Sequence, residues 1–197
     1  CLDRHRLSIQ IDLMGAKIHG IKNVLCLSGD HQSFGNHTGA KNVHDVDSMQ
    51  LVRMVQEMRD LNKFQGGDEI KGGGPRLFIG TAASPFSSPI AMRPLRLAKK
   101  VASGADFAQT QMIFDMKLFK EYMKRVVDMG LHEKIAILAG VGPLKSPPMA
   151  RFLHEQIPGI VVPPDCIQRI EDAGKGIDSN DKKALQDAYR AEGIKLC

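Results

Sequence analysis

Short apolar runs alternate with longer amphipathic stretches along the whole chain. Four runs have the length of a β-strand and are bounded by Gly, Asp or Pro, at 23–27, 76–81, 107–112 and 134–139, and a weaker run covers 159–162. Stretches of helical length separate them, at 3–19, 46–63, 90–103, 115–129 and 146–156. Because parallel strands need a crossover that a helix supplies, this alternation predicts an α/β fold with a parallel sheet covered on both faces.

The spacing of the later strands favours a closed barrel. They recur about every 28 to 30 residues, and no Gly-x-Gly-x-x-Gly turn follows any of them. Regular βα units of this kind favour a (β/α)₈ TIM barrel over an open dinucleotide-binding sheet. A complete barrel takes about 250 residues, whereas this chain has 197 and neither starts with Met nor caps its last helix before Cys197. We therefore expect residues 1–197 to form a single, incomplete barrel domain from a truncated chain.

Composition excludes several classes of protein. With 43% hydrophobic and 25% charged residues, the chain is typical of a globular domain, and it contains no membrane-length apolar run and no signal-peptide pattern. We expect a soluble, cytoplasmic protein. The formal net charge of +5 comes from scattered Lys and Arg, which suits an anionic small molecule better than nucleic acid.

Cysteine and histidine spacing predicts no metal site and no disulfide framework. Cys1, Cys26, Cys166 and Cys197 form no Cys-x-x-Cys pair, and Cys26 lies in an apolar run typical of a buried thiol. Three histidines gather after residue 30 with two aspartates close by, but their spacing matches no standard ligand pattern; they are His31, His37 and His44, beside Asp45 and Asp47.

Two polar residues stand out where predicted strands end, which is where a barrel carries its chemistry. Asp30 follows a Gly directly after the first strand, and its carboxylate either points into a pocket or caps the following loop. Gln111 ends an otherwise apolar strand, and its amide either binds a heterocycle or is satisfied by neighbours inside the barrel. The residue pattern alone leaves both alternatives open.

Several motifs together resemble the methylenetetrahydrofolate reductase family. The run 20–30, ending Leu27-Ser28-Gly29-Asp30, is similar to the family's strand and Gly-Asp motif, and 97–115 is similar to its most diagnostic stretch, with Gly-Ala-Asp, Thr-Gln and Phe-Asp. The similarity continues through the strand and Gly-x-x-Pro turn at 137–143, so it covers essentially the whole chain. The start Cys-x-Asp-Arg, with Asp45-Val46-Asp47-Ser48 and Ala83-Ser84-Pro85-Phe86, is closest to forms found in anaerobes that use the Wood–Ljungdahl pathway.

This resemblance implies a flavin-dependent enzyme of one-carbon metabolism that reduces 5,10-methylenetetrahydrofolate to 5-methyltetrahydrofolate. It implies a TIM barrel with the flavin across the strand ends, and an Asp30 carboxylate near both flavin and folate, with a catalytic role. Gln111 matches the family's folate-binding glutamine. The residues matching flavin contacts are Ser28, Gly29, Asp30, Ser84, Arg96 and Lys100.

The chain also departs from the family pattern. Ser28 replaces an arginine found in many bacterial relatives, Ser84 a histidine, Arg93 an acidic flavin contact, Arg96 an amide and Met149 a second substrate-side glutamine. These changes bear on the adenine end of FAD, so FMN is the alternative cofactor. The family's general acid is a glutamate on the first strand, and the first two βα units and the last strand have no counterpart here. We therefore expect this fragment to be inactive by itself.

The partners that we expect for this protein depend on its electron donor. A stand-alone reductase oxidises NADH or NADPH, whereas a subunit of a redox complex needs an iron–sulfur partner protein, because this chain has no cysteine cluster for such a centre. We expect an oligomer or a complex subunit. Two other functions remain open: a flavin-free, pterin-binding barrel that transfers a methyl group, and a non-catalytic subunit of a redox complex.

Overall fold

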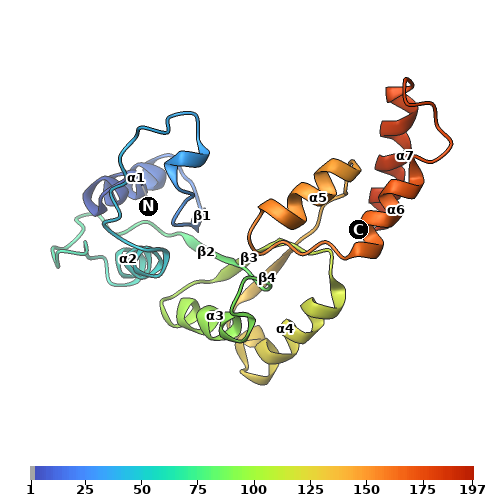
Figure 1. The fold of residues 1–197 in the computed structure, drawn as a ribbon. Helices are drawn as coiled ribbons and strands as arrows, with labels where there is room; N and C mark the ends of the chain where they lie inside the picture. Colours follow the sequence, from blue (N-terminus) through green and yellow to red (C-terminus); the bar gives the residue numbers. More distant parts are fainter. Residues whose placement is uncertain (1–2) are drawn as a thin grey trace. The chain divides into compact units, whose positions relative to one another are not determined.

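The computed structural model describes residues 3–197, and Cys1 of the sequence motif at the start of the chain lies outside them. Helices and strands alternate as the apolar pattern predicts (Figure 1). The strands are β1 (Asn23–Cys26), β2 (Phe78–Ala83), β3 (Phe107–Met112) and β4 (Ala136–Gly140). The helices are α1 (Arg6–Ile18), α2 (Ser48–Asp60), α3 (Arg93–Ala102), α4 (Met116–Asp128), α5 (Pro147–Gln156), α6 (Pro164–Ala173) and α7 (Lys182–Lys195).

The four strands form one parallel sheet in the order β1-β2-β3-β4, which confirms the α/β class. The register between β1 and β2 runs from Asn23 opposite Phe78 to Cys26 opposite Thr81. By its internal contacts the chain divides into two compact units. Unit 1 comprises residues 1–82, 95–109 and 130–137, and unit 2 comprises 83–94, 110–129 and 138–197.

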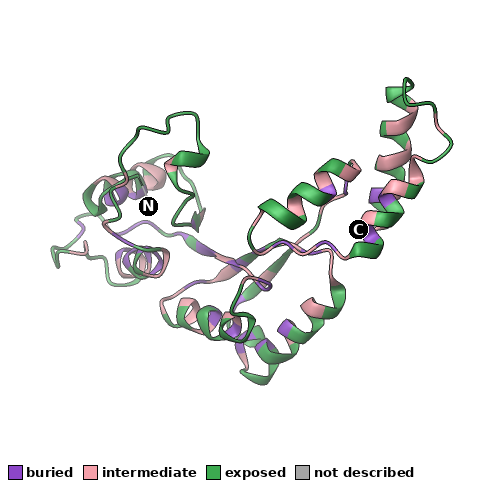
Figure 2. Cartoon of the chain, viewed as in Figure 1, coloured by how far each residue is buried: buried purple, intermediate pink, exposed green. Residues whose placement is uncertain are grey.

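Helix α2 supplies much of the buried surface of unit 1. Its first turn is held by a capping box, in which the Asp47 carboxylate accepts hydrogen bonds from Met49 N and Gln50 N while the Gln50 side chain accepts one from Asp47 N. One side of the helix is buried (Figure 2), with Leu51, Val52, Met54, Val55 and Met58 all 8% exposed or less. The helix thus packs through the amphipathic stripe that its sequence predicts.

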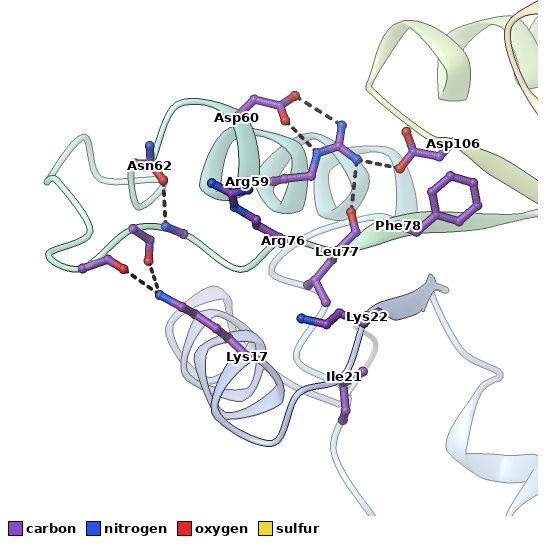
Figure 3. A pocket seen from close by; sticks show the side chains of 13 residues that line it. Lys17, Ile21, Lys22, Arg59, Asp60, Asn62, Arg76, Leu77, Phe78 and Asp106 are labelled. Atoms are coloured by element: carbon purple, nitrogen blue, oxygen red, sulfur yellow. Dashed lines mark hydrogen bonds and ion pairs between the residues drawn. The ribbon is translucent and has the colours of Figure 1, made fainter.

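The Asp106 carboxylate joins three elements of unit 1. Its Oδ2 accepts hydrogen bonds from Ile79 N at 2.7 Å and from Arg59 Nη1 at 2.5 Å. The same guanidinium donates to Leu77 O and pairs with Asp60 (Figure 3). Arg59 is in the last turn of α2, Ile79 is in β2, and Asp106 directly precedes β3. One carboxylate therefore connects the end of α2 with the starts of β2 and β3.

Unit 2 has its own apolar core. The segments around α5 and α6 bury Leu144, Ala150, Ile160, Val162, Cys166 and Ile170 together. Helices α6 and α7 lie side by side (Figure 1), and Arg169 of α6 pairs with Glu192 of α7. Gly193 packs so closely against the segment after β4 that a Cβ there would lie 2.0 Å from Leu144 O. Helix α7 is therefore built into unit 2 through a glycine contact.

Three predictions about the elements were wrong. The run 159–162 forms a turn and an unpaired extended segment and no strand, because its apolar residues serve packing: Ile160 and Val162 lie in the core of unit 2. The sequence analysis missed α6, whose start is hidden by the pair Pro163-Pro164; proline is favoured in the first turn of a helix. Strand β2 lies two residues later than expected.

The sequence analysis predicts strands that are covered on both faces, and the strands of unit 1 differ from this prediction. Leu25 of β1 is 39% exposed and Phe78 of β2 is 49% exposed, although their neighbours Cys26 and Ile79 are buried. The Phe78 ring stacks on that of Phe107, with centroids 5.4 Å apart. In β2, Gly80 and Thr81 are buried as well as Ile79, and Gly80 lies against the Phe107 ring, so the exposure is confined to particular positions of the two strands.

The cysteines of the described residues are free thiols, at positions 26, 166 and 197. Burial raises the pKa of Cys26 to about 12, which confirms it as a buried thiol held in its neutral form. None of the helices in 3–197 has the length and apolar content needed to cross a bilayer.

The role of Asp106 can be measured as stability. We expect Asp106→Ala to lower the free energy of unfolding by about 2–3 kcal/mol, because it leaves Ile79 N and the Arg59 guanidinium without a shared acceptor. Urea unfolding followed by circular dichroism measures the change. The control is Asp12→Ala, which removes an exposed pair with Arg4 and should cost less than about 0.5 kcal/mol. Equal losses in the two variants would contradict the assignment.

Candidate functional site

The segment directly after β1 presents three of the predicted site residues. Ser28, Gly29 and Asp30 are all exposed, and Gly29 has φ +90°, a left-handed conformation that glycine adopts without a Cβ penalty. Leu25 and Leu27, 39% and 40% exposed, lie beside this turn in the chain. The end of β1 thus combines an apolar surface with an open backbone turn and a carboxylate.

The Asp30 carboxylate makes no hydrogen bond or ion pair with any other residue of 3–197. The short 3-10 helix that follows (Gln32–Phe34) is instead capped by His31, whose Nδ1 accepts a hydrogen bond from Ser33 N at 3.2 Å. The structure therefore removes the alternative in which Asp30 caps the loop, and leaves its carboxylate available to a ligand.

Two of the cations on helix α3, Arg96 and Lys100, lie one turn apart in unit 1. Lys100 is half-buried, and its amine donates a hydrogen bond to Ala82 O at the end of β2. Burial lowers the pKa of Lys100, the charge of Arg96 lowers it further, and Asp47 acts in the opposite direction. An ammonium has three N–H donors, so Lys100 retains two for an anionic group while Arg96 remains exposed.

Ser84, just past β2 in unit 2, makes a hydrogen bond within the protein. Its hydroxyl hydrogen-bonds that of Ser87. Gly159, with φ +86°, lies directly against both: a Cβ there would sit 2.4 Å from each hydroxyl oxygen. Arg93 is committed as well, since its guanidinium donates to Ser87 O at 2.6 Å and to Ser88 O. The positions that depart from the family pattern here form a polar structural cluster.

Gln111 is displayed at the end of β3 in unit 2. Its side chain is exposed, and its amide makes no hydrogen bond within 3–197. The preceding Thr110 fixes the backbone, because its Oγ1 donates to Gln111 O at 2.7 Å and accepts from Gly140 N at 2.8 Å. The described neighbours therefore leave the amide of Gln111 unsatisfied and hold its position from behind.

The predicted residues divide between the two units. Ser28, Gly29, Asp30, Arg96 and Lys100 belong to unit 1, whereas Ser84 and Gln111 belong to unit 2. The sequence analysis missed Thr110 and Gly159 as supports. A buried hydroxyl beside an exposed amide is a weak signal in a sequence, and the partner of Gly159 lies about 75 residues away.

The aspartates near the histidine cluster have other partners. Asp45 holds the Arg6 guanidinium at 2.7 Å, which lowers the pKa of that carboxyl to about 2, and Asp47 caps α2. Across 3–197 no group of three or more His, Cys, Asp or Glu is arranged to hold a metal ion.

Comparison with known families now decides the assignment. A sequence model described as methylenetetrahydrofolate reductase matches residues 1–192. The chain belongs to the methylenetetrahydrofolate reductase family. No curated protein sequence is significantly similar to it. Membership of this family indicates an oxidoreductase of the methylenetetrahydrofolate reductase type, which acts in folate and one-carbon metabolism. Proteins of this family generally bind a flavin.

The residues of unit 1 fit a flavin of this reductase family in chemical character. A flavin has an apolar ring system and a phosphate-bearing chain. The exposed Leu25 and Leu27 offer an apolar surface, and Gly29 offers a backbone free of a side chain. Arg96 and Lys100 offer positive charge for phosphate.

The contact between Gly159 and the serines can be tested by substitution. We expect Gly159→Ala to lower the free energy of unfolding by about 1–3 kcal/mol more than Gly176→Ala, because the added methyl meets Ser84 and Ser87. Gly176 has a similar φ of +81° but open space around its Cβ position, so it controls for backbone strain. Adding Ser84→Ala and Ser87→Ala should recover most of the extra loss in thermal unfolding. A loss that persists in that triple variant would contradict the clash.

Proposed function

We propose that this chain is part of a flavin-dependent reductase that converts 5,10-methylenetetrahydrofolate to 5-methyltetrahydrofolate. The observation that carries the proposal is the Asp30 carboxylate, which lies in the turn after β1 of a reductase-family chain, is exposed and has no partner within 3–197. A carboxylate at a strand end that makes no hydrogen bond or ion pair within the fold is typical of a functional position.

In this proposal each predicted site residue has a separate role. Ser28 and Gly29 bring backbone to the flavin, with Arg96 and Lys100 near its phosphate and Ser84 at the end of β2. Gln111 binds the pterin edge of folate, because an amide offers one donor and one acceptor side by side. Asp30 orients the folate and acts electrostatically on the flavin ring.

A bound reduced flavin supplies the hydride for the methylene carbon. The protein residues position the folate and stabilise the charge that develops on it. Gln111 holds the pterin through paired hydrogen bonds. Asp30 places negative charge where positive charge develops on the folate ring. The proton that opens the imidazolidine ring comes from a general acid, which in the family pattern is a glutamate.

The finer assignments are part of the same proposal. The four parallel strands, adjacent in chain order and connected through helices, support a (β/α)₈ barrel. We propose FAD as cofactor, with FMN as the alternative. The Arg93 guanidinium is engaged by Ser87 O and Ser88 O, and this favours FMN because FMN has no adenine end to be bound. We also propose a cytoplasmic enzyme, in an oligomer or complex, that takes electrons from NAD(P)H or an iron–sulfur subunit.

An absorbance spectrum of the full-length protein, purified without oxygen, tests the function. We expect bands near ~370 and ~450 nm from bound flavin, bleached by dithionite and restored by 5,10-methylenetetrahydrofolate. Chromatography of the released cofactor then separates FAD from FMN. We expect Asp30→Asn to keep both bands and to slow restoration at least about tenfold. A colourless protein that neither flavin reconstitutes would overturn the proposal and favour a methyltransferase-like or non-catalytic role.

The role of Gln111 has a matched control on the same strand. We expect Gln111→Ala to weaken folate affinity about tenfold, because a paired donor and acceptor are lost, with flavin content unchanged. Gln109, exposed two residues earlier on the same face of β3, is the control, and Gln109→Ala should change affinity less than about twofold. Loss of flavin in Gln111→Ala alone would reject the placement.

A further inference from the structure

Unit 1 contains a cavity of about 880 Å³ at the amino-terminal ends of its strands (Figure 3). Residues at the starts of β1 and β2 line this cavity. The two strands are joined at this point by a hydrogen bond of 2.7 Å from Phe78 N to Lys22 O. Asp30 follows the opposite, carboxyl-terminal end of β1. The cavity is thus separate from the residues proposed for flavin and folate.

The lining is rich in cations from different parts of the chain. Lys17 comes from α1, Lys22 from the turn before β1, Arg59 from α2 and Arg76 from the segment before β2. Only two carboxylates, Asp60 and Asp106, line the same cavity. Four positive and two negative groups leave two positive charges in excess.

Both carboxylates are already committed. Arg59 lies between them, donating to Asp60 Oδ1 at 2.7 Å and to Asp106 Oδ2 at 2.5 Å. Gln56 also donates to Asp60, and Ile79 N to Asp106. These acids therefore neutralise Arg59 and help to order the wall, and they are poorly placed to neutralise the other cations.

Lys17 builds the glycine-rich side of the cavity. Its amine donates to Gly72 O at 2.9 Å and to Gly73 O at 2.6 Å. Gly72 and Gly73 have φ of +80° and +81°, and Gly74 N donates to Asn62 Oδ1 at 2.7 Å. The turn 72–74 is therefore held in place by side chains, and is not the freely flexible turn that three glycines would suggest.

The side chains of Lys22 and Arg76 make no hydrogen bond or ion pair within 3–197, although both residues line this cavity. They precede two adjacent, directly hydrogen-bonded strands, so their backbones are fixed near each other. Exposed Ile21 and Phe78, 47% and 49% accessible, form an apolar part of the same wall. Two unpaired cations beside an apolar surface suit a small organic anion of charge about −2.

We propose that this cavity binds the phosphate group of a small phosphorylated molecule. Lys22 and Arg76 pair with the phosphate oxygens, Arg76 through its planar fork of donors and Lys22 as a point charge. Two other cations hold the walls of the cavity in place. Lys17 does so through Gly72 and Gly73, and Arg59 through Asp60 and Asp106. The remainder of the ligand lies against Ile21 and Phe78.

Titration of the full-length protein with inorganic phosphate at constant ionic strength, followed by isothermal calorimetry, tests the site. We expect saturable binding to the natural protein, weakened at least about tenfold in Lys22→Gln/Arg76→Gln. The control is Lys120→Gln/Lys124→Gln, which removes the same charge from an exposed part of α4 and should change affinity less than about twofold.

Each outcome discriminates. Equal weakening by the two double variants would show a general charge effect and overturn the site, as would absence of phosphate binding. Tighter binding of succinate than of phosphate would overturn the ligand class, because a dicarboxylate has the same charge with a different geometry. Flavin content, measured in the same samples, should stay unchanged, so failure here is distinguishable from failure of the proposed reductase function.

Discussion

The Asp106 carboxylate is the interaction on which unit 1 most depends. A single oxygen accepts the backbone N–H of Ile79 and the guanidinium of Arg59, and Arg59 in turn reaches Leu77 O and Asp60. The start of β2, the start of β3 and the end of α2 are thereby tied to one partly buried charge. An ion pair with this many hydrogen bonds offsets its desolvation cost much better than an isolated pair would.

This arrangement separates structural from chemical polar groups along the strands. At the amino-terminal ends of the strands, Asp106 and Arg59 are bound to each other and to the backbone. Among residues 3–197, Asp30 beyond the carboxyl-terminal end of β1 has no partner, and the side-chain amide of Gln111 at the end of β3 makes no hydrogen bond, although Thr110 fixes the backbone there. Unsatisfied polar groups on a well-supported backbone are what a binding site requires, since a ligand can then complete their hydrogen bonds.

Sequence reasoning succeeded where a local pattern decides the outcome. The apolar runs located β1 and β3 nearly to the residue, and the amphipathic stripe of α2 became its buried side. It failed where packing competes with pattern: Ile160 and Val162 look like strand residues but fill a core, and Pro164 begins a helix. The Gly-Ala-Asp motif marked the family, yet the reason for its aspartate emerged only from the contacts with α2 and β2.

The sequence by itself determined the class of fold and the family, and it predicted residues at which chemistry should occur, because strand length, helical periodicity and motif order are properties of neighbours along the chain. The tertiary structure alone decided which polar groups are occupied. It committed Arg93 to backbone carbonyls and Ser84 to Ser87. Within the described residues it left four polar side chains without partners, those of Asp30, Gln111, Lys22 and Arg76. Whether a donor or acceptor is satisfied depends on groups that are distant in sequence and meet only when the chain folds.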